Sequence, residues 1–418
     1  MLRPSLLKAV GAVSIWAAAS SSLMVGKLVS SDVLVMGNYH GYISPDVASE
    51  LHDKYGFKVD YFEHDHIVKE KFDKGIYDMA VVSTSVLSEI RSSNSVHKLD
   101  WSKFTSTSTS TSKEDLFTDL VKEMSKESLL DYGIPYFVQK LGFYYTGPKI
   151  TSLSGSVSFS TLIQAISHDK RFKSDGKTPK LGLIDDPRTV LSLSRRVKGH
   201  DDINPSDHEY LSSEDILNDY KALISLGLNS SQLGSNFLFI NPDSSKMVDA
   251  LSNGDIKGAF MYNGDGLFAA NGGNLNAEVK AEEFHEVEIS DNIYFLDFVV
   301  LSPHLKGEKL EKAYNLAKEL LFLKAEHESN PFSKNNEEYG SMVVRNFDYV
   351  QYPPVLKKLH EKLDCYFSNE SNLKDLKQKI IKTEKPTNKD IKKSFEAFLD
   401  SRRKSDMLIA YENFKLML

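Results

Sequence analysis

The sequence predicts an α/β fold, because short apolar runs alternate along the chain with amphipathic helices. At 418 residues the chain is long enough for two domains of ordinary size. Hydrophobic residues make up 41% of the chain and charged residues 26%, which is typical of a globular protein. These proportions do not fit a disordered chain or one that fills a membrane.

The first thirty residues differ from the rest. Two basic residues precede an uncharged run over residues 9–25, which fits the core of a signal peptide and is just long enough to span a bilayer. The alanines at 17–19 suit a signal peptidase, and no cysteine follows them to take a lipid. We expect residues 1–31 to be a signal peptide or an N-terminal membrane anchor, with a buried N-terminal helix as the alternative. The rest of the chain is then extracytoplasmic.

The net charge and the cysteine content exclude some kinds of ligand and site. The formal net charge of −7 argues against nucleic acid and is compatible with a cationic ligand. Cys365 is the only cysteine, so the sequence excludes a disulfide framework and a cysteine metal cluster. We expect Cys365 to be an ordinary half-buried thiol.

The first half of the chain begins with a strand and a well-marked helix. Ser44 and Pro45 supply an N-cap and a first-turn proline, and Val47 and Leu51 repeat at helical spacing. The Ser/Thr-rich segment at residues 105–112 is too polar to bury and is expected to be a surface loop. Five apolar runs are predicted to be strands: residues 33–36, 58–62, 79–83, 135–145 and 180–184.

The second half continues the alternation. Asp186 and Pro187 start a helix, residues 210–226 form another, and residues 258–262 and 294–301 are strands. Apolar residues at helical spacing mark one face of a helix over 310–321. Near the end, a C-terminal helix is expected to present one apolar face made by Ile391, Phe395, Phe398 and Leu399.

Polar and aromatic side chains collect in the loops that directly follow these strands. In open α/β sheets, ligands bind beyond the carboxyl ends of the strands. The residues in those loops are Tyr39, Tyr42, Ser83, Ser85, Asp186, Tyr262 and Asp265.

Six segments, in order, resemble the spermidine/putrescine-binding proteins of polyamine ABC transporters. The family has tryptophan where this chain has Tyr39 and Tyr262. The segments are residues 38–42 (Asn-Tyr-His-Gly-Tyr), 77–84 (Tyr-Asp-Met-Ala-Val-Val-Ser-Thr), 134–137 (Ile-Pro-Tyr-Phe), 185–188 (Asp-Asp-Pro-Arg), 262–265 (Tyr-Asn-Gly-Asp) and 294–297 (Tyr-Phe-Leu-Asp).

The resemblance implies a two-lobed periplasmic-binding-protein fold of type II, with a ligand cleft between lobes joined by crossing strands. Lobe I would take residues 32–139 and 264–305, and lobe II residues 140–263 and 306–370. Residues 371–418 would form a C-terminal helical segment that packs on the lobes. The implied partners are a polyamine, the permease subunits of an importer and, through the N-terminal segment, the membrane. We expect a monomer that needs no cofactor.

A polyamine needs aromatic walls for its methylenes and carboxylates for its ammonium groups. Asp297 is the most informative residue, because it interrupts an otherwise apolar strand. An unpaired carboxylate there would cost several kcal/mol, so it needs a cation, either a ligand ammonium or a neighbouring lysine. The resemblance implies nine ligand-binding residues: Tyr39, Tyr42, Ser83, Ser85, Asp186, Tyr262, Asp265, Tyr294 and Asp297.

Several of these residues also have a structural interpretation. Asp186 is placed to cap a helix, Asp265 to satisfy a turn, and Ser83 to cap a strand end. Thr189 and Ser85 depart from the family, which has a glutamate and an aromatic or acidic residue there. Glu63 corresponds loosely to a family glutamate that faces the cleft.

The sequence also contains signals for other functions, and they are weaker. His64, Asp65 and His66 could hold a metal in a loop, but neighbouring positions on a strand face opposite ways. No catalytic triad emerges, and residues 271–274 lack the lysine of a phosphate-binding loop. An enzyme is therefore not expected. The alternatives left open are a binding protein for thiamine or a metal ion, and a surface protein with a degenerate binding domain.

Overall fold

The computed structural model describes residues 33–104, 112–125, 128–200, 211–324, 327–335, 338–368, 374–381 and 399–418. Residues 1–33 and residues 34–418 form two separate units, and every described helix and strand belongs to the second. The expected leader at 1–31, nearly all of the Ser/Thr-rich segment at 105–112, and Ile391, Phe395 and Phe398 lie outside the described residues.

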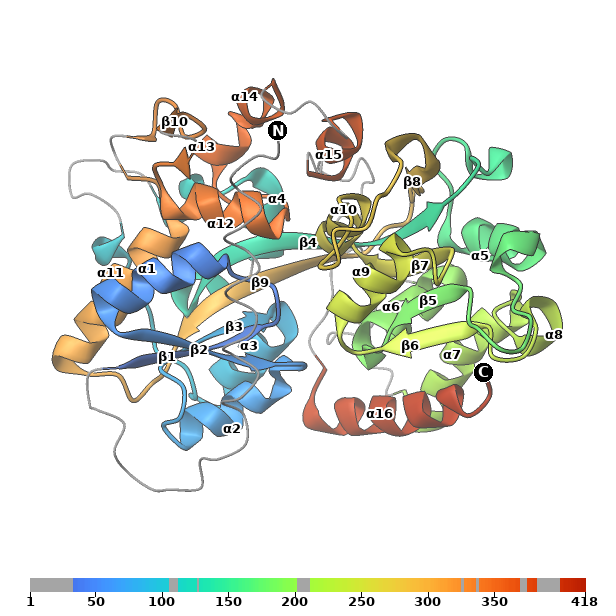
Figure 1. The fold of residues 1–418 in the computed structure, drawn as a ribbon. Coiled ribbons are helices and arrows are strands. Elements are labelled where there is room, and N and C mark those ends of the chain that lie inside the picture. Colours follow the sequence, from blue (N-terminus) through green and yellow to red (C-terminus); the bar gives the residue numbers. More distant parts are fainter. Residues whose placement is uncertain are drawn as a thin grey trace. The chain divides into compact units, whose positions relative to one another are not determined.

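A first sheet contains β2, β1, β3, β9 and the first half of β4, in that order (Figure 1). Strand β1 is parallel to β2 and β3, whereas β9 runs antiparallel to β3 and β4. The register places Asp297 of β9 opposite Ser83 of β3. The strands are β1 Leu34–Tyr39, β2 Phe57–Phe62, β3 Met79–Ser83, β4 Gly133–Thr146 and β9 Tyr294–Leu301.

A second sheet continues from the same β4, which therefore belongs to both (Figure 1). Lys140 pairs with Tyr294 of β9, and the next residue, Leu141, pairs with Tyr262 of β7. Strands β7, β5 and β6 are mutually parallel, and β8 pairs with the end of β4. These strands are β5 Leu181–Ile184, β6 Leu238–Asn241, β7 Gly258–Tyr262 and β8 Phe284–Glu286.

The helices begin and end at recognisable signals. Helix α1 starts at Pro45 and stops at Gly56, whose φ of 58° is in the left-handed region that favours glycine. Helix α7 begins with a capping box between Ser212 and Asp215. Along the first half the helices are α1 Pro45–Tyr55, α2 Val68–Asp73, α3 Thr84–Ser92, α4 Asp119–Met124, α5 Phe159–His168, α6 Pro187–Val197, α7 Ser213–Ser225 and α8 Ser230–Leu233.

The remaining elements are helices and one small hairpin-like pair. Strands β10 (Lys334–Asn335) and β11 (Glu338–Tyr339) pair only with each other. The helices are α9 Ser244–Ser252, α10 Asn263–Ala270, α11 Gly307–Leu321, α12 Met342–Val350, α13 Lys357–His360, α14 Leu363–Ser368, α15 Lys374–Ile381 and α16 Ser401–Lys415.

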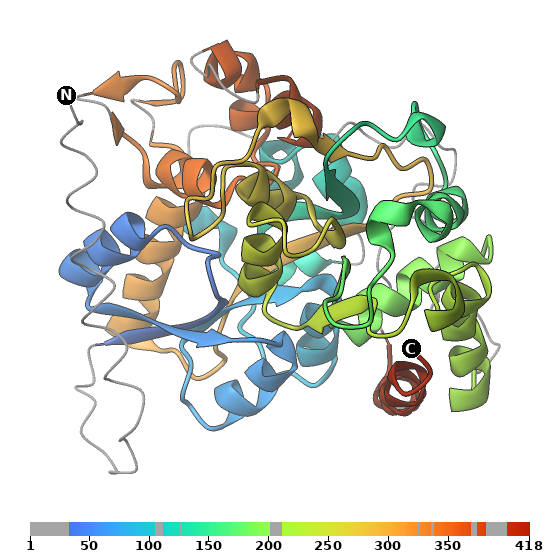
Figure 2. The same ribbon diagram turned by 45° about the vertical axis from the view of Figure 1, so that its right-hand side comes forward.

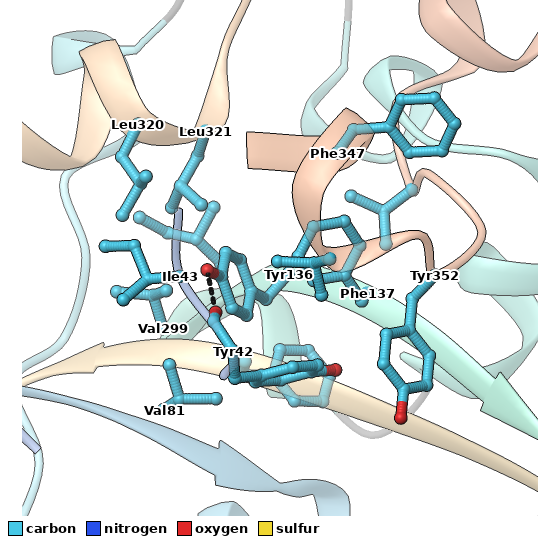
Figure 3. Packing of buried hydrophobic residues seen from close by; sticks show 14 of the residues in the cluster. Tyr42, Ile43, Val81, Tyr136, Phe137, Val299, Leu320, Leu321, Phe347 and Tyr352 are labelled. Atoms are coloured by element: carbon cyan, nitrogen blue, oxygen red, sulfur yellow. Dashed lines mark hydrogen bonds between the residues drawn. The ribbon is translucent and has the colours of Figure 1, made fainter. Parts of the chain in front are cut away.

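Two clusters of buried side chains hold these elements together. The first covers the first sheet with α1, α3, α11 and α12, and it continues through α10 and α15 onto one face of the second sheet. Figure 3 shows part of it, where Ile43 and Val299 lie with Leu320 and Leu321. The second cluster fills the opposite face of the second sheet beneath α5, α6, α7 and α16. Helix α16 runs beside α7 (Figures 1 and 2).

The division into lobes differs from the boundaries expected from the sequence. Residues 264–293, expected in lobe I, hold α10 and β8, which contact the second-sheet half of β4. Residues 306–370, expected in lobe II, hold α11 and α12, which pack on α1 in the first cluster. The physical reason is that β9 returns the chain to the first sheet at Tyr294, so the helices after it cover that sheet.

Most predicted elements are present with shifts of a few residues, and three details differ. Asp265, expected in a turn, lies in the first turn of α10. Ser44 precedes α1 as expected but makes no side-chain capping bond. Cys365, expected to be half-buried, is exposed. The apolar patterns did not indicate α5, α9 or β6.

The packing of α16 gives a first test. Phe414 is 1% exposed and stacks on Tyr220 of α7, with ring centroids 5.2 Å apart. Phe414→Ala should therefore cost about 3–5 kcal/mol of unfolding free energy. Ile409, on the same helix and 53% exposed, is the matched control, and Ile409→Ala should change stability by no more than about 0.5 kcal/mol. Urea unfolding measures both, and equal effects would contradict this packing.

Candidate functional site

A cavity of about 500 Å³ lies between residues of the two sheets. Its size is within the range of small-molecule binding sites. The loops after β1 and β3 line it from the first sheet, the segments after β5 and β7 from the second, and α16 contributes further side chains. Eight of the nine residues expected to bind ligand are brought together here: Tyr39, Tyr42, Ser83, Ser85, Asp186, Tyr262, Asp265 and Asp297.

Asp297 is only 3% exposed, although it lines the cavity. The Tyr42 hydroxyl donates a hydrogen bond to its Oδ2 at 2.7 Å, and Gln139 Nε2 donates to the same oxygen. Desolvation by burial raises the pKa of Asp297 from 3.8 to about 7, an effect that these two hydrogen bonds partly offset. Within the described chain, Asp297 has no lysine or arginine partner.

Two neighbouring tyrosines, Tyr136 and Tyr352, fix the position of Tyr42. The Tyr136 hydroxyl donates to the Tyr42 carbonyl oxygen at 2.7 Å, as Figure 3 shows. The Tyr42 ring also meets the Tyr352 ring edge-on, with centroids 5.3 Å apart. The hydroxyls of Tyr42 and Tyr352 point away from Leu320 and Leu321 in Figure 3. The first cluster thus packs the tyrosine rings from the inside, while the cavity receives the polar ends.

A second buried carboxylate comes from α10. Tyr352 and Ser244 form side-chain hydrogen bonds with Asp265 that stabilise its ionised form, but desolvation dominates and raises its pKa to about 7. Gly264 makes this approach possible, because a Cβ there would lie 2.2 Å from Cε2 of Tyr352. A side chain at this position would push Tyr352 away from the carboxylate.

Asp186 caps a helix, as the sequence predicts, and it also lies at the cavity. Its Oδ1 accepts from Thr189 N at 2.7 Å and caps α6, and the residue also lines the cavity. Burial raises its pKa, and nearby Asp65 adds to this, whereas the capping bond and His64 oppose it. Thr189 Oγ1 in turn lies 2.7 Å from the Tyr262 hydroxyl, which fixes that ring at the cavity wall.

Ser83 likewise combines a structural bond with a place in the cavity. Its hydroxyl accepts from Val86 N at 3.4 Å at the start of α3, and its backbone N donates to Asp65 Oδ2 at 2.8 Å. Glu63, His64 and His66 also line the cavity. Among the described residues, no group of three or more potential ligands is placed to hold a metal ion.

Tyr294 is the predicted site residue that does not line the cavity. Phe295 and Asp297 of the same strand do line it. Successive side chains of a strand point to opposite faces, so Tyr294 faces away from its neighbour Phe295. The resemblance implies Tyr294 as a site residue because Tyr294 belongs to the shared motif. A motif alone does not show which of its side chains face the cavity.

Sequence reasoning missed several lining residues. Gln139 gave a weak signal, because it interrupts the apolar run of β4. Tyr352 gave none, since it follows α12 in an ordinary loop. Lys404 comes from α16, and its Nζ lies 3.2 Å from Glu89 Oε2 on α3. Helix α16 therefore packs on the helices of the second sheet and forms an ion pair with a helix of the first.

The cavity carries an excess of negative charge. Asp185 is paired with Lys415 at 3.7 Å. Five other lining carboxylates have no ion pair with a lysine or arginine in the described part of the chain: Glu63, Asp65, Asp186, Asp265 and Asp297. Such a site favours a ligand that carries several positive charges next to aromatic surfaces.

Comparison with models of known protein families assigns the chain to one family. Residues 12–412 match the model of a family described as hypothetical lipoprotein (MG045 family). The chain belongs to this family. No curated protein sequence matches the chain at a significant level. Residues 1–32 contain no cysteine, although the family is described as lipoproteins. Within the described residues, no helix is long and apolar enough to cross a membrane.

Solved structures with the same fold include polyamine-transporter proteins. The spermidine/putrescine ABC transporter substrate-binding protein PotD of Streptococcus pneumoniae is 17% identical, with a TM-score of 0.57 over 93% of this chain and 99% of its own. The lipoprotein Tp0655 (TpPotD) of Treponema pallidum is 13% identical, with a TM-score of 0.59 over 92% and 99%. The chain has their two-lobed type II periplasmic-binding-protein fold, as the sequence predicted.

The fold is also shared with an enzyme. Thiaminase I of Bacillus thiaminolyticus is 14% identical, with a TM-score of 0.53 over 92% of this chain and 99% of its own. At this level of identity the likeness concerns the fold alone. What the cavity binds must therefore be argued from its own side chains.

The raised pKa values predict how the empty protein responds to pH. Asp265 and Asp297 have a pKa of about 7 when folded and near 3.8 when unfolded, so ionisation is penalised in the folded state. The unfolding free energy of ligand-free protein should fall as pH rises from about 4 to 7, by up to about 1.4 kcal/mol per pH unit for each group. Above that range their contribution stays level.

Melting curves of Asp297→Asn between pH 4.5 and 8 check this. The variant should lose less stability with rising pH than the parent, because it carries no charge to desolvate. Asp53→Asn, at an exposed position of α1, is the control and should follow the parent. If the Asp297→Asn and parent curves ran parallel, the buried carboxylate would not be the source.

Proposed function

We propose that this protein is an extracytoplasmic solute-binding protein that captures a polyamine, spermidine or putrescine, and delivers it to an ABC importer. The observation that carries the proposal is the set of five cavity carboxylates, Glu63, Asp65, Asp186, Asp265 and Asp297, without a lysine or arginine partner in the described chain. A ligand with two or more ammonium groups supplies the missing charge.

The placement of the carboxylates favours an elongated cation over a single compact one. Asp297 belongs to β9 of the first sheet, whereas Asp186 caps α6 and Asp265 lies in the first turn of α10, both beside the second sheet. Separate anionic points on the two sides suit ammonium groups joined by a flexible chain. Each ion pair formed in this desolvated site replaces hydration that the carboxylate has already lost.

Aromatic side chains suit the methylenes between the ammonium groups. Tyr39, Tyr42, Tyr262 and Phe295 all line the cavity. Tyr262 and Phe295 meet edge-on with centroids 5.4 Å apart, as do Tyr39 and Tyr42 at 5.9 Å. Ring faces bind both alkyl chains and cations, so these four rings serve a polyamine along its length.

Transport, rather than catalysis, is the role that we propose for this cavity. In this mechanism the ligand draws the two lobes together, and the permease recognises the closed form. The apolar run at residues 9–25 would keep the protein at the outer face of the membrane. The lipoprotein description of the family supports a membrane-associated, extracytoplasmic location.

Calorimetry tests the ligand class. Spermidine or putrescine should bind with a dissociation constant in the micromolar range or tighter, about −8 kcal/mol or better. Binding should be tighter at pH 8 than at pH 6, because Asp265 and Asp297 must be ionised to pair with ammonium. Butane-1,4-diol, which matches putrescine in length but carries no charge, is the control. Binding of thiamine or a metal ion but of neither polyamine would refute the proposal.

Asp297→Asn tests the residue on which the site depends most. The amide keeps the shape but loses the charge, and breaking a desolvated ion pair costs roughly 3–5 kcal/mol. Spermidine affinity should therefore fall by about two to four orders of magnitude, while the empty variant stays folded. A large drop in the melting temperature with affinity intact would show that Asp297 has a structural partner instead.

A further inference from the structure

An exposed aromatic group lies at the rim of the cavity. The imidazole of His40 stacks on the ring of Tyr61, with centroids 4.8 Å apart and an interplanar angle of 22°. His40 follows β1 and Tyr61 belongs to β2, where it is 43% exposed. Tyr349, near the end of α12, is also 43% exposed. Three separate segments thus contribute to one exposed aromatic group, His40, Tyr61 and Tyr349, which we call the rim group.

The rim group is continuous with the cavity. His40 and Tyr349 both line it, together with the buried Tyr42 and Tyr352 that contact each other. Partial burial raises the pKa of Tyr61, and the nearby hydroxyl of Tyr349 adds to this effect. Two of the three rim residues thus belong to the same cavity wall as Asp297.

An acidic side chain stands beside the rim group. Partial burial raises the pKa of Tyr349, and the nearby carboxylate of Asp46 adds to this effect. Asp46 lies exposed in the first turn of α1. Ring faces next to a carboxylate form a typical binding site for an ammonium group. Single exposed aromatics are common on protein surfaces, but three of them gathered at a cavity rim beside an acid are not explained by packing.

We propose that Tyr61, Tyr349 and His40, together with Asp46, form an outer subsite for an additional ammonium group of a longer polyamine. This inference rests on the proposed function and extends it. The inner carboxylates hold the part of the ligand that every polyamine has, and the rim group contacts only molecules long enough to reach it. The subsite therefore favours triamines and tetraamines over diamines.

The experiment titrates the full-length protein with putrescine, spermidine and spermine at one pH and ionic strength. Tyr61→Leu and Tyr349→Leu each remove one ring and keep an apolar side chain. Each change should weaken spermine binding by about twofold to fivefold, the magnitude of an exposed cation–π contact, and should leave putrescine binding unchanged. Asp46→Asn should act in the same direction, and its effect should shrink at high salt.

Two controls separate the possible outcomes. Tyr61→Phe and Tyr349→Phe keep the ring and should bind spermine like the parent. Unchanged putrescine affinity in the leucine variants shows that they are folded and that the inner site is intact. If the leucine variants bind all three amines like the parent, or weaken all three equally, the outer subsite is refuted. If the parent binds none of the amines, the proposed function fails instead.

Discussion

The pairing of β4 with β9 is the interaction on which both the fold and the cavity depend. Strand β4 pairs with β9 through Lys140 and with β7 from Leu141 onward, so one continuous strand belongs to both sheets. The same pairing brings Gln139 of β4 to the carboxylate of Asp297, 158 residues away in the chain. A shift of β4 by one residue would turn Gln139 away from the cavity and leave Asp297 with fewer hydrogen bonds.

The buried acids lower the stability of the empty protein. An apolar residue in place of Asp297 would remove the cost of burying a carboxylate, and the rest of β9 consists almost entirely of such residues. Instead, Tyr42 and Gln139 donate to a carboxylate that burial disfavours. The same logic applies to Asp265 with Tyr352 and Ser244. Buried cavity carboxylates with strongly raised pKa values are typical of functional sites.

Local signals account for what could be predicted from the sequence. The run at Asp186 and Pro187 marked the start of α6, and the apolar stretch broken by Asp297 marked both a strand and a site residue. The contributions of Gln139, Tyr352 and Lys404 could not be predicted, because each reaches the cavity through contacts distant in sequence.

One wrong prediction, and one predicted site residue that lies outside the cavity wall, have physical explanations. The glycines that flank Asp265 indicate a turn, but they serve close packing in a helix, where Gly266 lies against Tyr144. Tyr294 shares a motif with Asp297 and is therefore expected in the site, although it is absent from the cavity wall that Phe295 and Asp297 form. In both cases the sequence shows which residues are present but not which way they face in the folded chain.

The position of α16 has a consequence for the way in which the protein is made. Its buried residues Tyr411 and Phe414 complete the second cluster, whose other helices, α5, α6, α7 and α8, all precede residue 234. The first sheet likewise lacks β9 until residue 301 has been synthesised. Neither lobe can therefore finish folding in the order in which the ribosome produces the chain. The N-terminal part therefore keeps unpaired strand edges until the later segments have been synthesised. A chain that stops short of residue 400 would lack part of the cavity wall and part of the second cluster.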